Sequence, residues 1–419
     1  MVNCWFCGTE ITTENESVEH IIPNAVHGRL KSKNLLCLNC NNQLSNLDSI
    51  LDKSLKPITA LIDEKKDRKG KSPRLVMKEP KTGKKFILGS AFRFESFNPD
   101  IIKTVHKDGK IEYNFQGDMK QYKKFKENLE KKYQGKEIIV TNCREEEIRP
   151  RLTEDNDWNI SIGDLFLPLL KIAINYYLHC NNDISHVNEV IDLIKSGNFI
   201  EDKSWYYYPA YDVVRKEEKC EILNSLVIIG DQQNKILYCY ISLYGSFNFV
   251  ICLNNNYLGP NVKNIYTSKI NGEEVQREVN IDLSRETLKK LLNECIIPTK
   301  NMSNSVTDLI GILRSQAIHT HLKITLQGFI RKNPNKSINE IWEIVELEFD
   351  EIPTSDWVNW LLCVPHEEHW EQNLKCDCGH DRFSFNLSGI KDGVIKEITL
   401  ISECNACDNK SVSNYLVPI

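Results

Sequence analysis

Apolar residues recur at helical spacing in two stretches of the chain. In the first, leucines three or four positions apart occupy one face of a helix: Leu44, Leu47, Leu51 and Leu55. In the second, residues 162–180, the same spacing links Leu165, Leu169, Ile172 and Tyr176. We therefore predict an amphipathic helix after residue 40 and a long helix over residues 162–180. Further helices are expected at about residues 120–133, 186–195, 285–294, 306–330, 337–347 and 353–370.

Strand patterns dominate the middle of the chain. Residues 222–229, 235–243 and 247–253 are rich in β-branched and aromatic side chains, and turn residues such as Gly230 and Gly245 separate them. Short connections of this kind join neighbouring antiparallel strands, so we predict a meander. Shorter strands are expected at residues 85–88 and 111–115.

Together these elements predict an α+β multidomain protein. A chain of 419 residues is too long for one compact core. We divide it into an N-terminal unit, a charged linker without apolar periodicity, a mixed α+β middle region and a C-terminal unit, at residues 1–62, 63–74, 75–372 and 373–419. The middle region is expected to serve targeting, regulation or oligomerisation.

The charge of the chain is unevenly distributed. The net charge is −5, yet residues 29–85 contain fifteen Lys and Arg against six Asp and Glu. A basic region beside an acidic remainder is a hint of a polyanion partner. Apolar residues at 41% and charged residues at 26% exclude wholesale disorder.

Cysteine usage bears on the cellular compartment. The chain opens without a basic and apolar leader, and its longest apolar stretch, residues 236–253, is interrupted by polar residues and glycine. We therefore expect a cytoplasmic protein without a membrane span. In a reducing compartment the closely spaced members of the fifteen cysteines are expected to bind metal rather than to form disulfides.

Two cysteine pairs frame the N-terminal unit. Cys4 and Cys7 form one CxxC pair, and Cys37 and Cys40 form another. Four thiolates complete one tetrahedral Zn²⁺ site, and the 29 residues between the pairs are too few to bury a core of their own. We therefore predict a structural zinc in this unit.

Polar residues with a recognisable spacing lie around the second pair. Glu19 and His20 precede Ile21-Ile22-Pro23, a glycine and Asn34 follow, and Asn41 comes directly after Cys40. The pattern CxxC…EHIIP…G…N…CxxCN resembles the zinc-knuckle branch of the HNH endonucleases, the ββα-metal nucleases. The resemblance covers about residues 4–55. His27 replaces the first residue of the family's usual Gly-Gly, as an extra phosphate contact or as filler.

The resemblance implies a role for each of these side chains. His20 would be the general base, Glu19 and Asn41 would bind a catalytic Mg²⁺ or Mn²⁺, and Asn34 would orient His20. Asn41 is predicted at a helix start from which it can face the strand that carries Glu19. Independently of the family, an imidazole suits proton transfer near neutral pH, and a cation held by oxygen ligands stabilises charge during phosphodiester hydrolysis.

A second cysteine quartet lies near the C-terminus. It consists of Cys376, Cys378, Cys404 and Cys407, with strand candidates between the pairs. Short cysteine turns linked by β-hairpins are typical of a zinc ribbon, in which His380 could replace one thiolate. Such a ribbon would bind nucleic acid, brace the fold or dock a protein.

The resemblance predicts metal-dependent cleavage of DNA that leaves 5′-phosphate and 3′-hydroxyl ends. The expected context is a bacterial restriction or anti-phage defence effector. The expected partners are DNA, with RNA as a less favoured substrate, and a homo-oligomer or another defence protein. The alternative is a catalytically silent, zinc-dependent nucleic-acid-binding protein.

Overall fold

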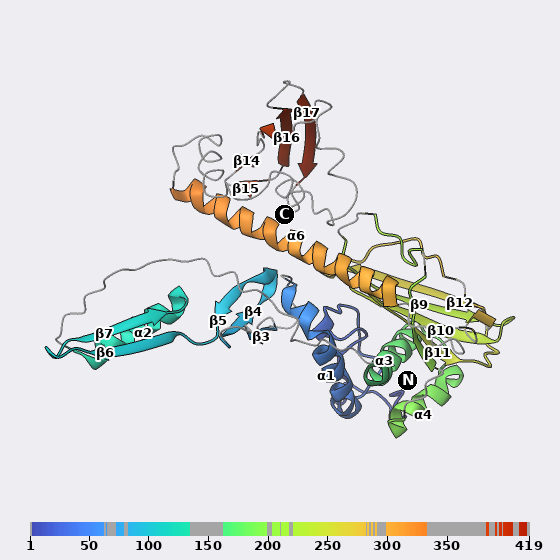
Figure 1. The fold of residues 1–419 in the computed structure, drawn as a ribbon. Coiled ribbons are helices and arrows are strands. Elements are labelled where there is room, and N and C mark those ends of the chain that lie inside the picture. The colour runs from blue at the N-terminus through green and yellow to red at the C-terminus, as the bar shows by residue number, and fades with distance from the viewer. Residues whose placement is uncertain are drawn as a thin grey trace.

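The computed structural model describes residues 2–62, 64, 73–78, 83–134, 162–198, 203–209, 211–217, 221–281, 283–284, 286–287, 290, 299–332, 383–384, 390–391, 394–395, 397–404 and 410–416. Within these residues the chain is an α+β protein with several antiparallel sheets and five α-helices (Figure 1). The predicted fold class is confirmed at this level.

The N-terminal unit is a short hairpin followed by a long helix. The hairpin pairs β1 (Glu19–His20) with β2 (Lys31–Ser32), and η1 (Asn24–Val26) lies in the connection. Helix α1 (Leu38–Leu61) buries the four leucines whose spacing predicted it: Leu44, Leu47, Leu51 and Leu55. Local periodicity therefore located this helix correctly.

A five-stranded antiparallel sheet forms the centre of the molecule. Its order is β12-β9-β10-β11-β8, and the strands are β8 (Ser204–Tyr206), β9 (Leu223–Asp231), β10 (Ile236–Leu243), β11 (Phe247–Asn254) and β12 (Val262–Lys269). The predicted meander is β9-β10-β11. Edge strands β8 and β12 were not predicted, because β8 is short and the first half of β12 is partly exposed and mixes polar with apolar residues.

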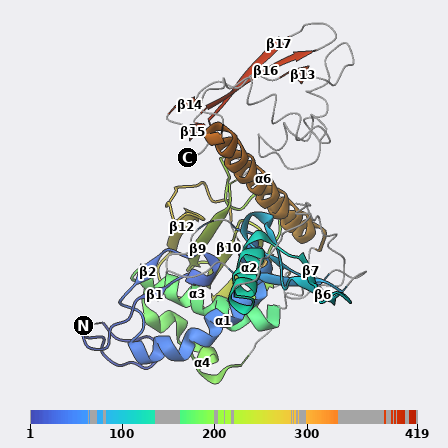
Figure 2. The same ribbon diagram turned by 90° about the vertical axis from the view of Figure 1, so that its left-hand side faces the viewer.

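Helix α3 (Ile162–His179) lies between α1 and the sheet (Figure 2). Helix α4 (Asn188–Ser196) follows α3 in the chain and is preceded by η3 (Ile184–Val187). Helices α3 and α4 cover one side of the sheet, and a second apolar cluster covers the other side. Every residue of β10 is therefore buried. One continuous hydrophobic core includes Leu51 of α1, Leu169 of α3 and Phe247 of the sheet. The N-terminal unit therefore shares its core with the middle region.

Smaller antiparallel sheets follow α1 in the chain. One contains β3 (Leu75–Lys78), β4 (Lys85–Leu88) and β5 (Phe94–Ser96), with η2 (Ser90–Phe92) before β5. A separate hairpin of β6 (Asp100–Val105) and β7 (Ile111–Gln116) packs its aromatic residues against those of α2 (Met119–Lys132). Three expected elements are thereby confirmed: β4, β7 and the lysine-rich helix.

After the central sheet the chain continues with α6 (Thr299–Lys332), which contains the helix expected at residues 306–330 and packs against η2. The remaining strands are β13 (Phe383–Ser384), β14 (Ile390–Lys391), β15 (Val394–Ile395), β16 (Glu397–Cys404) and β17 (Lys410–Leu416). β13, β16 and β17 form an antiparallel sheet. No described helix has the length and the apolar composition to cross a bilayer.

Several expectations concern residues outside the described ones. They are the helices at 337–347 and 353–370, most of the helix at 285–294, most of the linker at 63–74, and Cys376, Cys378, His380 and Cys407. The backbone places Cys404 at the end of β16, opposite Phe383. The C-terminal zinc ribbon therefore stays a prediction.

Candidate nuclease site

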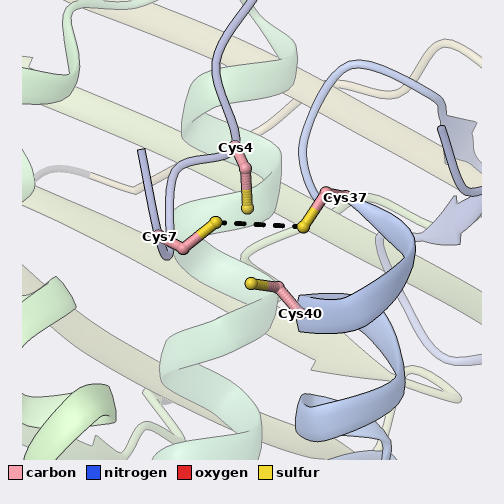
Figure 3. A group of neighbouring side chains, drawn as sticks. All are labelled: Cys4, Cys7, Cys37 and Cys40. Carbon is pink, nitrogen blue, oxygen red and sulfur yellow. Dashed lines mark hydrogen bonds between the residues drawn. The ribbon is translucent and has the colours of Figure 1, made fainter. Parts of the chain in front are cut away.

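The four N-terminal cysteines converge on one point. Cys4 and Cys7 come from the first turn of the chain, and Cys37 and Cys40 come from the start of α1 (Figure 3). Their four sulfur atoms all lie within 4.8 Å of one another, and the Sγ atoms of Cys7 and Cys37 are 3.8 Å apart. Sulfur ligands about 2.3 Å from a tetrahedral Zn²⁺ lie roughly 3.8 Å from each other, so this geometry fits zinc.

Burial and mutual contacts shift the pKa values of these thiols in different directions. Burial raises the pKa of the Cys4 and Cys40 thiols. Burial acts in the same direction on Cys7, but hydrogen bonds with Thr9 and with the neighbouring cysteines outweigh it and lower the pKa of this thiol to about 6. Four thiolates at this point require a compensating positive charge, which a bound zinc ion would supply.

Backbone geometry fixes the hairpin that carries Glu19 and His20. Pro23 caps η1, and the loop returns so closely that a Cβ atom on Gly28 would lie 1.8 Å from the carbonyl oxygen of Ile22. No side chain fits at that distance. The glycine of the sequence pattern is therefore required by close packing of the backbone against itself.

This contact gives a testable prediction. Gly28→Ala should destabilise the protein by about 1–3 kcal/mol or more, because the backbone of Ile22 must move to admit the methyl group. Denaturant unfolding measures the change. Gly311→Ala is the matched control, because its Cβ would enter open space on α6. Equal stability of Gly28→Ala and the parent protein would contradict the packing described.

Glu19 lies at the centre of a buried polar network. It is 2% exposed, and its Oε1 is 2.8 Å from Nζ of Lys171 and accepts a hydrogen bond of 3.0 Å from Nδ2 of Asn175. Lys171 also donates to Oδ1 of Asp48 on α1 at 2.8 Å. Trp5 Nε1 donates to Oδ1 of Asn175 at 2.9 Å. The network therefore links the first turn of the chain and α1 to Glu19 through two residues of α3.

The charge state of Glu19 reflects two opposing effects. Burial raises the pKa of its carboxyl group, whereas the positive charge and hydrogen bond of Lys171 lower it. The net direction is upward, because burial is the larger effect. Lys171 is itself only 1% exposed, so the ion pair is shielded from solvent.

Asn41 faces the segment that leads into β1 and Glu19, as the helix pattern predicted. Its Nδ2 donates to Oγ of Ser17 at 3.1 Å and approaches the carbonyl oxygen of Val18 at 3.4 Å. Ser17 in turn donates to the carbonyl oxygen of Leu36. These bonds fix the amide of Asn41 and leave its Oδ1 to accept another contact or bind a cation.

His20 and His27 are buried, whereas Asn34 is exposed. His20 is next to Glu19 in β1 and is buried, whereas Asn34 is exposed in the loop before α1, where its backbone N–H donates to Oγ of Ser32. His27 is buried at a φ of 61°, and its Nδ1 is 3.3 Å from the hydroxyl group of Tyr244. Because it packs against the turn between β10 and β11, His27 is an internal contact and not a surface phosphate ligand.

Sequence reasoning missed the residues that surround Glu19. Lys171 and Asn175 are polar positions four residues apart within the otherwise apolar centre of α3. That spacing places both on one helix face, and a buried lysine requires a carboxylate partner. This signal could have indicated a polar contact, but the sequence alone could not name Glu19 as the partner.

Comparison with known proteins agrees with this geometry. The family model described as HNH endonuclease matches residues 4–56. Neither a curated protein nor a solved structure matches the chain. The matched segment begins at the first cysteine of the quartet and contains the hairpin and most of α1. Residues 4–56 are therefore similar to HNH endonucleases and contain a cysteine cluster that could form a zinc site.

Proposed function

We propose that this protein is a metal-dependent endonuclease that hydrolyses DNA phosphodiester bonds. The observation that carries the proposal is the hydrogen bond of Asn41 to Ser17, two residues before Glu19, within the segment that contains the thiol quartet and matches the HNH family. The four cysteines join the first turn of the chain to the start of α1. The carboxylate of Glu19 and the imidazole of His20 belong to adjacent residues of β1, and Asn41 is bonded to the segment directly before them.

The donor atoms suit a hard divalent cation. Glu19 offers Oε2, since both of its contacts use Oε1, and Asn41 offers Oδ1. Carboxylate and amide oxygens are ligands that Mg²⁺ and Mn²⁺ accept. A bound cation would stabilise the charge that develops on the phosphate and the leaving oxygen.

The side chains of the chain itself supply the proton transfer. His20 takes a proton from the attacking water, because a neutral imidazole is an effective base near neutral pH. Asn34 orients His20, a role that rests on the family pattern. Hydrolysis then leaves a 5′-phosphate and a 3′-hydroxyl group.

Cleavage of supercoiled plasmid tests the proposal. Purified protein should nick or linearise the plasmid with Mg²⁺ or Mn²⁺, and EDTA should stop the reaction. A single-stranded RNA of equal length serves as the competing substrate. Plasmid that stays intact under all metal conditions, while the protein retards it on a gel, would contradict an intrinsic nuclease.

The biological context we propose is a bacterial restriction or anti-phage effector in the cytoplasm. The middle region is far larger than the 53 residues matched to the nuclease family, so it offers room for targeting, oligomerisation or a partner defence protein. Thiols stay reduced in the cytoplasm, and the four cysteines must be reduced in order to bind a metal.

A catalytically silent DNA-binding protein is the second candidate function. The observation that favours it is the burial of Glu19 together with its pairing to Lys171, because a carboxylate that serves only the fold would have these contacts. Metal titration distinguishes the two functions. A silent protein would bind DNA equally well with and without Mg²⁺.

Glu19→Gln gives a second test of the site. The substitution keeps an oxygen for Lys171 and Asn175 but removes the negative charge, so the fold is retained while cation binding weakens. We expect the Mn²⁺ concentration for half-maximal cleavage to rise by roughly tenfold or more. Saturating Mn²⁺ should restore part of the activity. An unchanged metal requirement would remove Glu19 from the list of cation ligands.

A further inference from the structure

Two buried side chains of α3 contact the carboxylate of Glu19. Lys171 and Asn175 are 1% and 0% exposed, and they reach Oε1 of Glu19 at 2.8 and 3.0 Å. Both lie far outside the matched residues 4–56. The segment that carries the family pattern therefore does not contain all the groups that surround its own acidic residue.

The orientation of Asn175 is fixed by a third residue. Trp5 has only an N–H donor on its ring, so the atom of Asn175 that faces it must be the oxygen Oδ1. The amide nitrogen Nδ2 is then turned toward Glu19. Because Trp5 follows Cys4 of the thiol quartet, this chain of hydrogen bonds links the zinc knuckle to the acidic residue.

The charges around Lys171 do not cancel. Its ammonium group lies 2.8 Å from both Glu19 and Asp48, so one positive charge faces two carboxylates. The side chain of Asp48 is 30% exposed, whereas that of Glu19 is 3% exposed. With both carboxylates ionised the cluster has a net negative charge, and both of the Glu19 contacts fall on a single oxygen.

We propose that Lys171 and Asn175 are positioning residues for the nuclease site. They hold Oε1 of Glu19 so that Oε2 is directed for cation binding, which makes the site a composite of the HNH segment and α3. This inference rests on the proposed function, in which Glu19 is a cation ligand. It goes further by assigning roles to two residues that the family pattern does not contain.

A buried carboxylate needs such positioning because burying its charge without fixed partners costs free energy. A carboxyl group in an apolar site tends to become protonated, and only a paired and hydrogen-bonded one stays charged in a single orientation. Residues that orient a metal ligand typically contribute 10–100-fold to metal affinity. Lys171 supplies the charge pairing, and Asn175 supplies a neutral donor on the same oxygen.

Manganese affinity of the full-length protein tests this inference. We expect Asn175→Leu, which changes no charge, to weaken Mn²⁺ binding by roughly 10–100-fold in calorimetry of the zinc-loaded protein. Lys171→Met should weaken it as well. Lys203→Met is the matched control, because Lys203 is also buried but pairs with Glu189. Its Mn²⁺ affinity should equal that of the parent protein.

The Mn²⁺ affinities of the Asn175 and Lys171 variants distinguish a positioning role from a purely structural contact. Unchanged Mn²⁺ affinity in folded Asn175→Leu would reduce Asn175 to a structural contact and overturn the proposal. Tighter binding in Lys171→Met would also overturn it, because Lys171 would then compete with the cation. Zinc content and the thermal unfolding midpoint establish that each variant is folded.

The unmutated protein provides a measurement that does not depend on folding of a variant. Bound Mn²⁺ should broaden the side-chain amide resonance of Asn175 in a nuclear magnetic resonance spectrum, since Asn175 contacts the proposed ligand. Cleavage that requires Mn²⁺ without such broadening would overturn the composite site but leave the nuclease proposal intact. Absence of Mn²⁺-dependent cleavage would instead contradict the proposed function itself.

Discussion

Replacing His20 with alanine is expected to reduce DNA cleavage by roughly 10²–10⁴-fold, the range for loss of a general base. The reason is that no group would then take the proton from the attacking water, while Glu19 and Asn41 could still bind the cation. Zinc content and DNA affinity should stay close to those of the parent protein. Single-turnover cleavage of a labelled duplex at saturating Mn²⁺ measures the effect.

Two controls make this result specific. His106→Ala removes an exposed histidine on the β6–β7 hairpin and should cleave as the parent does. Raising the Mn²⁺ concentration should not restore His20→Ala, in contrast to its partial restoration of Glu19→Gln. If His20→Ala cleaved normally, or if metal restored it as fully as Glu19→Gln, His20 would not be the base.

Loss of the zinc site should have the largest effect on stability. Cys37→Ser or Cys40→Ser removes one of four sulfur ligands that lie within 4.8 Å of one another. Structural zinc contributes about 10–16 kcal/mol to the folding of small zinc-finger domains. We expect residues 4–40 to lose hydrogen-exchange protection and cleavage to disappear. Elemental analysis of the parent should give at least one zinc per chain, and about two if the C-terminal quartet also binds.

A cysteine outside the quartet serves as the comparison. Cys180 lies just beyond α3 and is partly buried, so Cys180→Ser changes a thiol without removing a ligand. Its zinc content and cleavage should match those of the parent. Full activity in Cys37→Ser, with exchange protection retained over residues 4–40, would show that the knuckle does not depend on zinc.

Local patterns in the sequence predicted the main elements of the fold. The leucine spacing located α1, the apolar spacing located α3, and the turn residues separated β9, β10 and β11. Each of these signals arises between residues close in sequence, where helix and strand periods alone decide which side chains share a face. Edge strands β8 and β12 were not predicted, because β8 has only three residues and the first half of β12 is partly exposed and lacks a clear apolar pattern.

The shared core could not be predicted in the same way. Division of the chain at residue 62 follows a change of composition, yet buried residues of α1, α3 and the sheet form one cluster. Composition marks a charged linker but contains no information about which apolar faces meet. The contact between α1 and α3 was decided only by the folded structure.

The sequence by itself determined the cysteine quartet and the HNH pattern, because CxxC spacing and the Glu19-His20 pair are local features. It also indicated that Asn41 lies in the first turn of a helix and faces the segment before Glu19. Only the tertiary structure decided that Lys171 and Asn175 hold that glutamate, since these partners are more than 150 residues apart. A buried carboxylate must find a positive charge or a donor, but the sequence cannot specify which distant one the fold brings to it.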